Sequence, residues 1–265
     1  DGKRDSVNCL VGSEMCIRDS TFTIFKLVRP YYEPGILKPY RRGLRRIMRR
    51  LGYSRDLAVF RINLDDFNGS VKVPLDDLSK QFKAQQKATD TIIMQYLSKP
   101  KTHKFLARYQ EFTETPGKCA AKSGDRWATV KLRHHIPILI YQRLATVRAF
   151  DDGLDGASVK QLHRLRIRFK DLRYALQFFV PLLGKNAEKI LLNLNQAKDI
   201  LGDLNDTSVA LRLLEDVEGL DESVIRYRAF QESEQERLRN SFLPVWQQIE
   251  NDQWRRDLAE SMATL

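Results

Sequence analysis

Five side chains between residues 158 and 184 have types and a spacing that suit anion binding. They are His163, Arg166, Lys170, Arg173 and Tyr174. Wound at 3.6 residues per turn, they fall on one side of a helix. No acid lies on that side to form the i,i+4 pairs that a solvated basic face usually carries. Arginine forks onto phosphate oxygens, lysine supplies a point charge, and histidine and tyrosine add hydrogen-bonding groups. The pattern therefore predicts a surface for a multivalent anion, above all phosphate, and the alternative is a solvated basic face.

The same segment predicts the helix that positions these side chains. Its apolar residues form one narrow stripe, which is typical of a helix that packs on a core. The stripe consists of Leu165, Phe169, Leu172, Leu176 and Phe179. Ser158 is suited to cap the start of the helix, and Gly184, beyond Pro181, is suited to end it. The basic side chains are thus expected opposite the core-facing stripe.

Two stretches of the chain resemble a known family. LHRLRIRFKDLRYALQFF contains His-x-x-Arg followed by Lys-x-x-Arg-Tyr, and LGDLNDTSVALRLL follows it downstream. In order and separation they resemble the second half of a CHAD domain, the conserved histidine α-helical domain. The resemblance implies an all-α fold of two similar antiparallel helical bundles related by an internal duplication. It also implies that inorganic polyphosphate is bound in a basic channel between the bundles. Nucleic acid is then expected only as a non-specific competitor. A separate polyphosphate-related enzyme is left open as a second partner.

A second basic stretch lies in the first half of the chain. Residues 35–51 predict a helix, and six arginines without an acid lie between residues 41 and 50. Those expected to contribute to the polyphosphate site are Arg42, Arg45, Arg46 and Arg49. The alternative is a solvated face or a non-specific nucleic-acid patch. Arg133, in a predicted helix over 127–151, is a further candidate for the basic surface.

An internal duplication is visible when LGYSRDLAVF (51–60) is compared with LGDLNDTSVA (201–210). The Leu-Gly pair, the aspartate and the valine match at one constant offset. The halves are expected at about 21–120 and 121–265. In each half the glycine is expected to end one helix and the aspartate to begin the next. Asp56 and Asp206 are therefore assigned structural or orienting roles, together with their matched neighbours Arg55 and Asn205.

Residues 1–20 do not resemble the rest of the chain. DGKRDSVNCLVGSEMCIRDS has no amphipathic period and is similar to translated sequencing-adapter sequence. We interpret it as a sequencing or assembly artefact, or else as a poorly ordered tail, and exclude it from the expected CHAD domain at 21–265. By the duplication, the counterpart of His163 should lie near residues 12–20, which contain neither a histidine nor a basic stripe. Here the chain departs from the family pattern.

Amphipathic segments and breakers predict the remaining elements. A helix is expected to end at Pro30, a loop is expected at 67–76, and the linker between the halves is expected at 114–126. Further helices are expected at 76–97, 99–113, 186–201, 203–217 and, as one or two helices, 221–262. Predicted core residues include Leu78, Phe82, Ile92, Ile93 and Leu106, and Trp246 and Trp254 are expected to pack the carboxyl terminus against the rest.

Composition points to a polyanionic partner. The 265 residues carry a net charge of +11. No run of about 18 apolar residues is present, so no membrane span is expected. No signal peptide is apparent, and we expect a cytoplasmic location, in association with polyphosphate granules if the resemblance holds. The three cysteines have no paired spacing that would suggest a disulfide framework.

Motifs of catalysis are not apparent. The sequence lacks a phosphate-binding glycine loop, a nucleophile elbow and a His-Glu-x-x-His zinc motif. His134 and His135 are adjacent and diverge on a helix, so no metal site is expected there. The pairs Asp65-Asp66 and Asp76-Asp77 diverge likewise. We therefore expect binding without turnover and without a cofactor; the alternatives are a nucleic-acid-binding helical protein and a metal-dependent phosphohydrolase.

Overall fold

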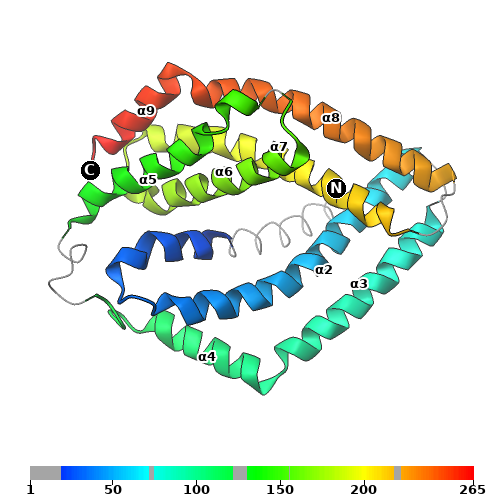
Figure 1. The fold of residues 1–265 in the computed structure, drawn as a ribbon, viewed down its shortest axis with the longest axis horizontal. Helices are drawn as coiled ribbons and strands as arrows, with labels where there is room; N and C mark the ends of the chain where they lie inside the picture. The colour runs from blue at the N-terminus through cyan, green and yellow to red at the C-terminus, as the bar shows by residue number, and fades with distance from the viewer. Residues whose placement is uncertain (1–18, 72–74, 122–129, 155, 218–221) are drawn as a thin grey trace. The chain divides into compact units, whose positions relative to one another are not determined.

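The computed structural model of the chain describes residues 19–71, 75–121, 130–154, 156–217 and 222–265 (Figure 1). Within these ranges the backbone is helical apart from turns, loops and an isolated bridge between Tyr32 and Ala120. The all-α class expected from the sequence is therefore confirmed. Most of the aberrant segment 1–20 lies outside the described residues, as does part of the predicted linker 114–126. The loop predicted at 67–76 was wrong over residues 67–71, which are helical, and residues 72–74 lie outside the described ranges.

The described α-helices are mostly long, and short 3-10 helices lie among them. Residues 19–28 are helical. The elements after them are η1 (Arg29–Tyr31), α2 (Leu37–Val71), α3 (Asp76–Leu97), α4 (Pro100–Glu114), α5 (Leu132–Arg148), η2 (Asp151–Gly153), α6 (Val159–Phe179), η3 (Val180–Leu182), α7 (Asn186–Glu215), α8 (Glu222–Glu250) and α9 (Asp252–Met262). None of the described helices has the length and apolar content that crossing a membrane requires.

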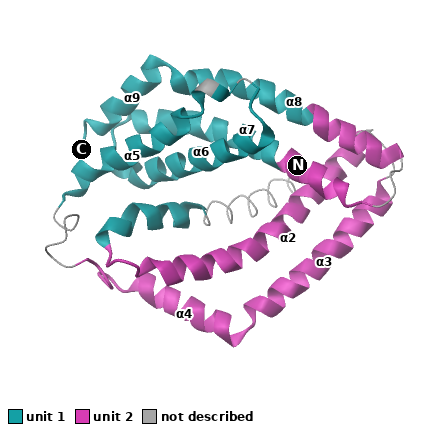
Figure 2. Cartoon of the chain, in the orientation of Figure 1, with its two compact units in different colours: residues 1–31, 122–205, 234–265 teal, residues 32–121, 206–233 magenta. Residues whose placement is uncertain are grey.

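The helices form two compact units, each with its own hydrophobic core (Figure 2). Unit 1 comprises residues 1–31, 122–205 and 234–265, and unit 2 comprises residues 32–121 and 206–233. Both α7 and α8 contribute one part to each unit.

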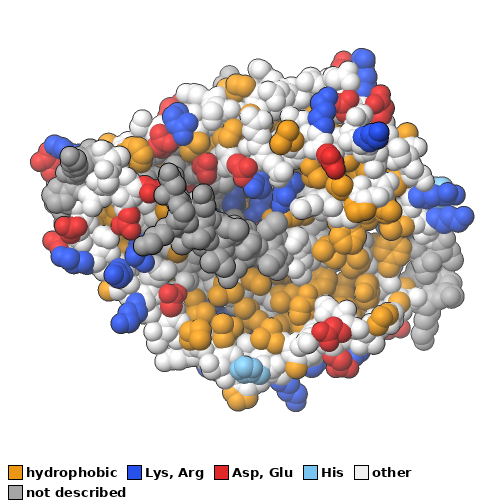
Figure 3. All heavy atoms as spheres, turned by 180° about the vertical axis from the view of Figure 1, so that it is seen from behind, with side chains coloured by type: hydrophobic (Ala, Val, Ile, Leu, Met, Phe, Trp, Pro, Cys, Tyr) orange, Lys and Arg blue, Asp and Glu red, His pale blue; other side chains and the backbone are white. Residues whose placement is uncertain are grey.

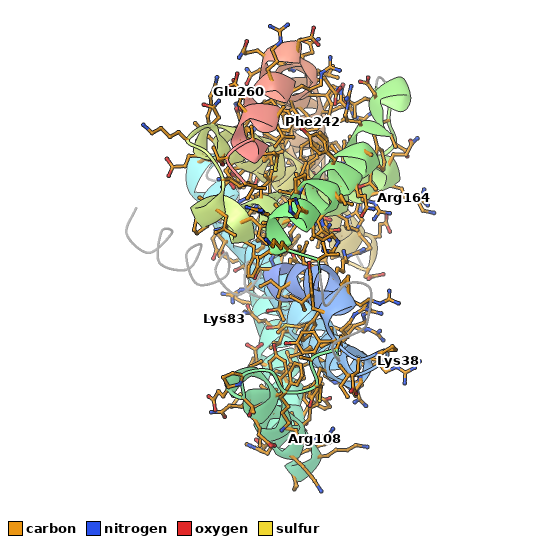
Figure 4. All side chains as sticks on the ribbon, turned by 90° about the vertical axis from the view of Figure 1, so that its left-hand side faces the viewer. Lys38, Lys83, Arg108, Arg164, Phe242 and Glu260 are labelled. Atoms are coloured by element: carbon orange, nitrogen blue, oxygen red, sulfur yellow. The ribbon has the colours of Figure 1, made fainter. Side chains whose placement is uncertain are left out.

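Helix α6 lies in the core of unit 1, as its apolar stripe predicts. Leu165, Phe169, Leu172 and Leu176 are fully buried. Phe169 packs edge-on against Trp246, which is buried like Trp254, so the expected packing of the carboxyl-terminal helices is confirmed. Figure 4 shows Phe242 among the helices of this unit, whereas Arg164 and Glu260 project from its surface.

The start of α6 is fixed by the cap expected from the sequence. The Ser158 hydroxyl accepts a hydrogen bond from the backbone N–H of Gln161, and the Gln161 side chain accepts one from the backbone N–H of Ser158. This reciprocal pair satisfies two donors that a helix start otherwise leaves open. It thereby fixes the residue at which α6 begins.

In unit 2, α2 packs along α3. Phe60 and Phe82 lie with ring centroids 4.3 Å apart, and Tyr227 of α8 closes the same cluster. Leu78, Phe82 and Ile93 of α3 are buried as predicted.

The predictions for Ile92 and Leu106 were wrong. They are 62% and 39% exposed, and uncovered hydrophobic side chains of this kind are visible on the face shown in Figure 3. Successive helical residues point about 100° apart, so Ile92 and Ile93 cannot both face the narrow contact with α2.

The predicted helix breaks at the two matched glycines were also wrong. Helix α2 runs through Gly52, and α7 runs through Gly202. Gly202 does not adopt the left-handed backbone that ends a helix at glycine. A glycine inside a helix costs only about 1 kcal/mol, and burial of Leu201 and Leu204 beside it outweighs that cost. Asp56 and Asp206 consequently lie inside helices, not at helix starts.

One helical glycine lies directly against an aromatic ring. A Cβ added at Gly43 would lie 2.1 Å from Cε2 of Phe105, so α4 approaches α2 where a side chain is missing. A Cβ added at Gly202 would meet no atom within 4 Å. The two glycines share helix propensity but differ in their surroundings.

We expect Gly43→Ala and Gly202→Ala to change stability in opposite directions. Gly202→Ala should raise the free energy of unfolding by roughly 0.5–1 kcal/mol, because alanine is the better helix former. Gly43→Ala should lower it, because the Phe105 ring must move. Urea denaturation of both variants measures the difference, and an equal gain in both would contradict the close approach.

Candidate anion-binding site

The basic side of α6 is buried, as is its apolar side. Arg166 is 7% exposed, and Lys170 and Arg173 are each 6% exposed. Taking a cation out of water costs several kcal/mol unless anionic or polar partners replace the water. Three successive turns of α6 therefore each carry a buried cation. Each of these cations needs an anionic group or a hydrogen-bond acceptor next to it.

Arg173 is held in one orientation by three neighbours. Its Nη1 donates to Oε1 of Gln177 at 3.0 Å and to Oδ1 of Asn195, on α7, at 3.3 Å. Its guanidinium lies 4.0 Å from the centroid of the Tyr174 ring. Tyr174, 5% exposed, thus supports Arg173 through a cation–π contact.

Lys170 already has an anionic partner within the chain. Its Nζ forms an ion pair with the Asp19 carboxylate, and the Lys170 side chain is only 8% exposed. Asp19 belongs to the segment that the sequence analysis excluded. A carboxylate therefore lies on one of the cations expected to contact phosphate.

His163 lies at the exposed start of the basic side of α6. Its Nδ1 is 2.7 Å from Oδ1 of Asn205. With the amide oxygen as acceptor, Nδ1 carries the proton, and Nε2 is the ring atom left to meet a ligand. The orienting role expected for Asn205 thus has a direct geometric counterpart.

Asp171, next to Lys170, ties α6 to two other elements of unit 1. It accepts a hydrogen bond from Thr23 at 2.9 Å and forms an ion pair with Lys26 at 2.9 Å. On its other side Nε of Arg143 lies 3.9 Å away. Burial lowers the pKa of the Arg143 guanidinium, and the Asp171 charge opposes that shift. This carboxylate anchors both the helical segment 19–28 and α5 beside the basic side.

Arg133 and the adjacent histidines lie at the start of α5. Arg133 is exposed, and its Nε is 3.4 Å from Nε2 of His134. His135 points the other way into unit 1, where Nδ1 is 2.5 Å from the Tyr31 hydroxyl. Burial lowers the pKa of His135. The two imidazoles thus diverge, as expected of adjacent residues on a helix.

In unit 2 the structure gathers four predicted site residues around one open hollow. It has a volume of about 550 Å³ and is lined by Pro39, Arg42, Arg45, Arg46 and Arg49. Their spacing of i, i+3, i+4 and i+7 places all four guanidinium groups on one side of α2. Arg50 is directed elsewhere, because its guanidinium lies 3.9 Å from the centroid of the Tyr96 ring.

The two matched aspartates meet at one arginine of unit 2. Nη1 of Arg55 is 3.3 Å from Asp56, and Nη2 is 3.2 Å from Asp206. Burial raises the pKa of Asp56, and the Asp206 charge adds to this, while Arg55 and Arg212 oppose it. Arg55 thus joins α2 to the part of α7 that lies in unit 2.

The site residues lie within a segment that matches a known family. Residues 23–215, about three quarters of the chain, match the CHAD domain. The chain belongs to the CHAD domain family. A comparison with curated proteins found no match. The match begins after the aberrant amino-terminal segment, so the CHAD domain includes α6 and the arginine-rich part of α2 but not Asp19.

The paired aspartates of the CHAD domain do not form a cluster of metal ligands. Asp77 forms an exposed ion pair with Lys80, and Asp65 accepts a hydrogen bond from Ser79. Across the ranges that the structure describes, no group of three histidine, cysteine, aspartate or glutamate side chains is arranged to hold a metal ion.

Sequence reasoning missed several residues that hold the basic side chains. Gln177 lies four residues after Arg173, so helical spacing alone contained that signal. Asn195 and Asp19 reach the site from other parts of the chain, and only the packing of unit 1 reveals them. Asp19 was missed because its whole segment was set aside.

We expect the elevated pKa of Asp56 to appear as a pH-dependent effect of Asp56→Asn. Folding raises this pKa above its ordinary 3.8, so the folded state holds the proton more tightly than the unfolded chain. The contribution of Asp56 to stability is then complete below the ordinary pKa and falls as pH rises through the folded value. The free energy of unfolding of Asp56→Asn minus that of the original chain should therefore be larger at pH 7 than at about pH 3.

Urea denaturation at several pH values tests this expectation. Asp77→Asn, which removes an equal charge from an exposed aspartate, is the control for a general charge effect. A free-energy difference for Asp56→Asn that falls as pH rises would contradict the sign.

Proposed function

We propose that this CHAD domain binds inorganic polyphosphate without turning it over. The observation that carries the proposal is the hollow lined by four arginines on α2. No acid is among the residues that line it. Arginine donates paired hydrogen bonds to phosphate oxygens and stays charged at any physiological pH, so the lining suits a polyanion.

The spacing of the four arginines favours an extended anion with repeated charges. From Arg42 to Arg49 the helix rises by about 10 Å, two turns of α-helix. A single small anion contacts one end of such a row, whereas a polymer of identical phosphate units contacts all of it. Because each unit carries the same charge, charge spacing suffices for recognition and no base-specific contact is needed.

The buried basic side of α6 supports the same proposal from unit 1. Arg166, Lys170 and Arg173 lie in a region from which water is largely excluded, where their attraction for an anion is less screened than at the surface. Arg173 is already held by Gln177 and Asn195, so little side-chain freedom is lost when it contacts phosphate. His163 contributes hydrogen bonding at the exposed edge.

Two other functions remain as alternatives. A nucleic-acid binder usually places exposed aromatic side chains among its basic ones, and the α2 hollow is lined by arginine and proline. A phosphohydrolase would release phosphate in the presence of Mg²⁺ or Mn²⁺. The basic channel, the internal duplication, the absence of turnover and the cytoplasmic location stay predictions.

Competitive binding at about physiological salt tests the proposal. Labelled polyphosphate is titrated with single-stranded DNA, double-stranded DNA and RNA as competitors, and phosphate release with Mg²⁺ is followed in parallel. We expect binding that nucleic acid does not displace and no release of phosphate. Equal displacement by nucleic acid would favour a generic basic surface, and release would favour the hydrolase.

We expect Arg42→Gln/Arg45→Gln/Arg46→Gln/Arg49→Gln to weaken polyphosphate binding by roughly tenfold or more, because several charge-assisted hydrogen bonds are lost. The affinity should also depend less steeply on salt. All four side chains are exposed, so folding should be unaffected. Replacing exposed Lys99, Lys101, Lys104 and Arg108 of the same unit by glutamine removes equal charge and is the matched control.

The counterpart in unit 1 is Arg166→Ala/Lys170→Ala/Arg173→Ala. It should abolish tight binding, but these side chains are buried, so circular dichroism must first show that the variant folds. If it does not fold, the exposed α2 variant decides the question. Equal loss in the α2 variant and its control would contradict a specific role for the hollow.

Asp19→Asn should strengthen polyphosphate binding several-fold. The Asp19 carboxylate occupies Lys170, so it competes with phosphate for that ammonium. Glu111→Gln removes an equal charge from an exposed pair with Lys118 and is the control. Fluorescence titration compares the two variants, and an equal gain in both would show that only net charge matters.

A further inference from the structure

A second hollow of unit 2 lies between α2 and α3, away from the four arginines. It has a volume of about 470 Å³, and its lining includes Arg61, Lys83, Lys87, Asp90 and Met94. Arg61 lies twelve residues beyond Arg49, which is about 18 Å along the axis of α2. Figure 4 shows that Lys83 and Lys38 project from opposite sides of unit 2. The two hollows are therefore separate places on the surface.

The charges of this groove are unbalanced. Arg61, Lys83 and Lys87 carry three positive charges, and Asp90 carries the one negative charge of the lining. None of the three cations forms an ion pair with a described residue. Some other described cations do pair with an acid one turn away, as Lys80 does with Asp77 on the same helix.

Polar contacts fix the walls of the groove. Nη1 of Arg61 donates to Oε1 of Gln86 at 2.6 Å, which holds the guanidinium between the two helices. Asp90 accepts a hydrogen bond from the Ser54 hydroxyl at 2.5 Å, so its carboxylate is directed toward α2. Nε of Arg61 is buried and has no hydrogen-bond partner among the described residues. The lining thus combines an arginine of α2 held by a hydrogen bond with two exposed lysines of α3.

We propose that this groove is a second anion site that takes a di- or triphosphate group. Lys83 and Lys87 lie one turn apart on the same side of α3 and repel each other until an anion lies between them. The lining carries a net charge of +2, which a single phosphate can balance, so size and the spread of the cations over two helices favour the longer group. A single phosphate leaves most of the volume empty, whereas two or three linked phosphates can meet cations of both α2 and α3. Met94 adds an apolar wall beside them.

Two sources could supply this chemistry: the end of a polyphosphate chain and the phosphates of a nucleotide. They share the linked phosphate groups that the three cations recognise. Met94, 62% exposed, offers apolar surface that a nucleoside can cover and inorganic phosphate cannot. The inference does not depend on the proposed function, because it concerns other residues and another hollow.

Lysine footprinting on the intact chain tests the site directly. The chain is acetylated briefly with and without inorganic triphosphate, and the modification of each lysine is measured by mass spectrometry. We expect Lys83 and Lys87 to react several-fold more slowly with triphosphate present. Exposed Lys80, Lys101 and Lys104 of the same unit should be unchanged, and sodium sulfate at equal ionic strength should protect none of them.

Two further arms separate the sources, and a variant separates the two sites. Adenosine triphosphate and long-chain polyphosphate replace triphosphate, and the source that protects at the lower concentration is the better ligand. The footprint should persist in Arg42→Gln/Arg45→Gln/Arg46→Gln/Arg49→Gln, whether or not that variant binds polyphosphate. Uniform protection of all lysines, or none at Lys83 and Lys87, would overturn the proposal.

A pair of variants tests the same site by affinity. By calorimetry, Lys83→Gln/Lys87→Gln should weaken triphosphate binding at least tenfold when the four α2 arginines are also glutamine. Lys101→Gln/Lys104→Gln in the same background removes equal charge and should leave the affinity within twofold. If both double variants weakened triphosphate binding equally, the groove would be a solvated basic face and not a binding site.

Discussion

The burial of positive charge on α6 is the constraint on which the organisation of unit 1 depends. One side of this helix packs into the apolar core, and the other places Arg166, Lys170 and Arg173 almost out of reach of solvent. Cations in such a position are tolerated only when acceptors surround them. Asn195 and Asp19 approach from other segments, and each contacts one of these cations. The packing partners of α6 are thus selected by charge as well as by apolar fit.

The two basic surfaces assigned to anion binding differ in how they are prepared for a ligand. Arg173 on α6 is buried and oriented by neighbours, so a phosphate that reaches it meets donors already in place. Arg42 and Arg49 on α2 are exposed around an open hollow and lose more side-chain freedom when they bind. Preorganised donors favour tight contact with one phosphate, and adaptable donors favour a polymer that presents many equivalent positions. The proposal thus assigns each unit its own kind of contact with phosphate.

Periodicity predicted which residues share a helix face, and this part of the fold agrees with the structure. The stripe that contains Phe169 and the cap at Ser158 follow from local rules, because helix geometry and capping involve residues close in sequence. The breaks at Gly52 and Gly202 were wrong because burial of neighbouring side chains outweighs the modest helix cost of glycine. The prediction that Ile92 is buried was wrong because periodicity does not give the width of the contact between α3 and α2. Within the candidate site, periodicity grouped the basic side chains, but what covers them is decided by segments distant in sequence.

The places where basic side chains have no acidic neighbour say more about function than the net charge of the chain does. A net charge of +11 points to a polyanionic partner but does not show where on the protein that partner would bind. Some described cations are compensated by an acid one turn away, as in the pairs Lys80–Asp77 and Arg226–Glu222. Such exposed pairs contribute little to stability, and they leave little net charge for an anion to meet. In the α2 hollow, by contrast, arginines supply all the charge of the lining. An anion that binds in this hollow supplies the negative charge that its lining lacks.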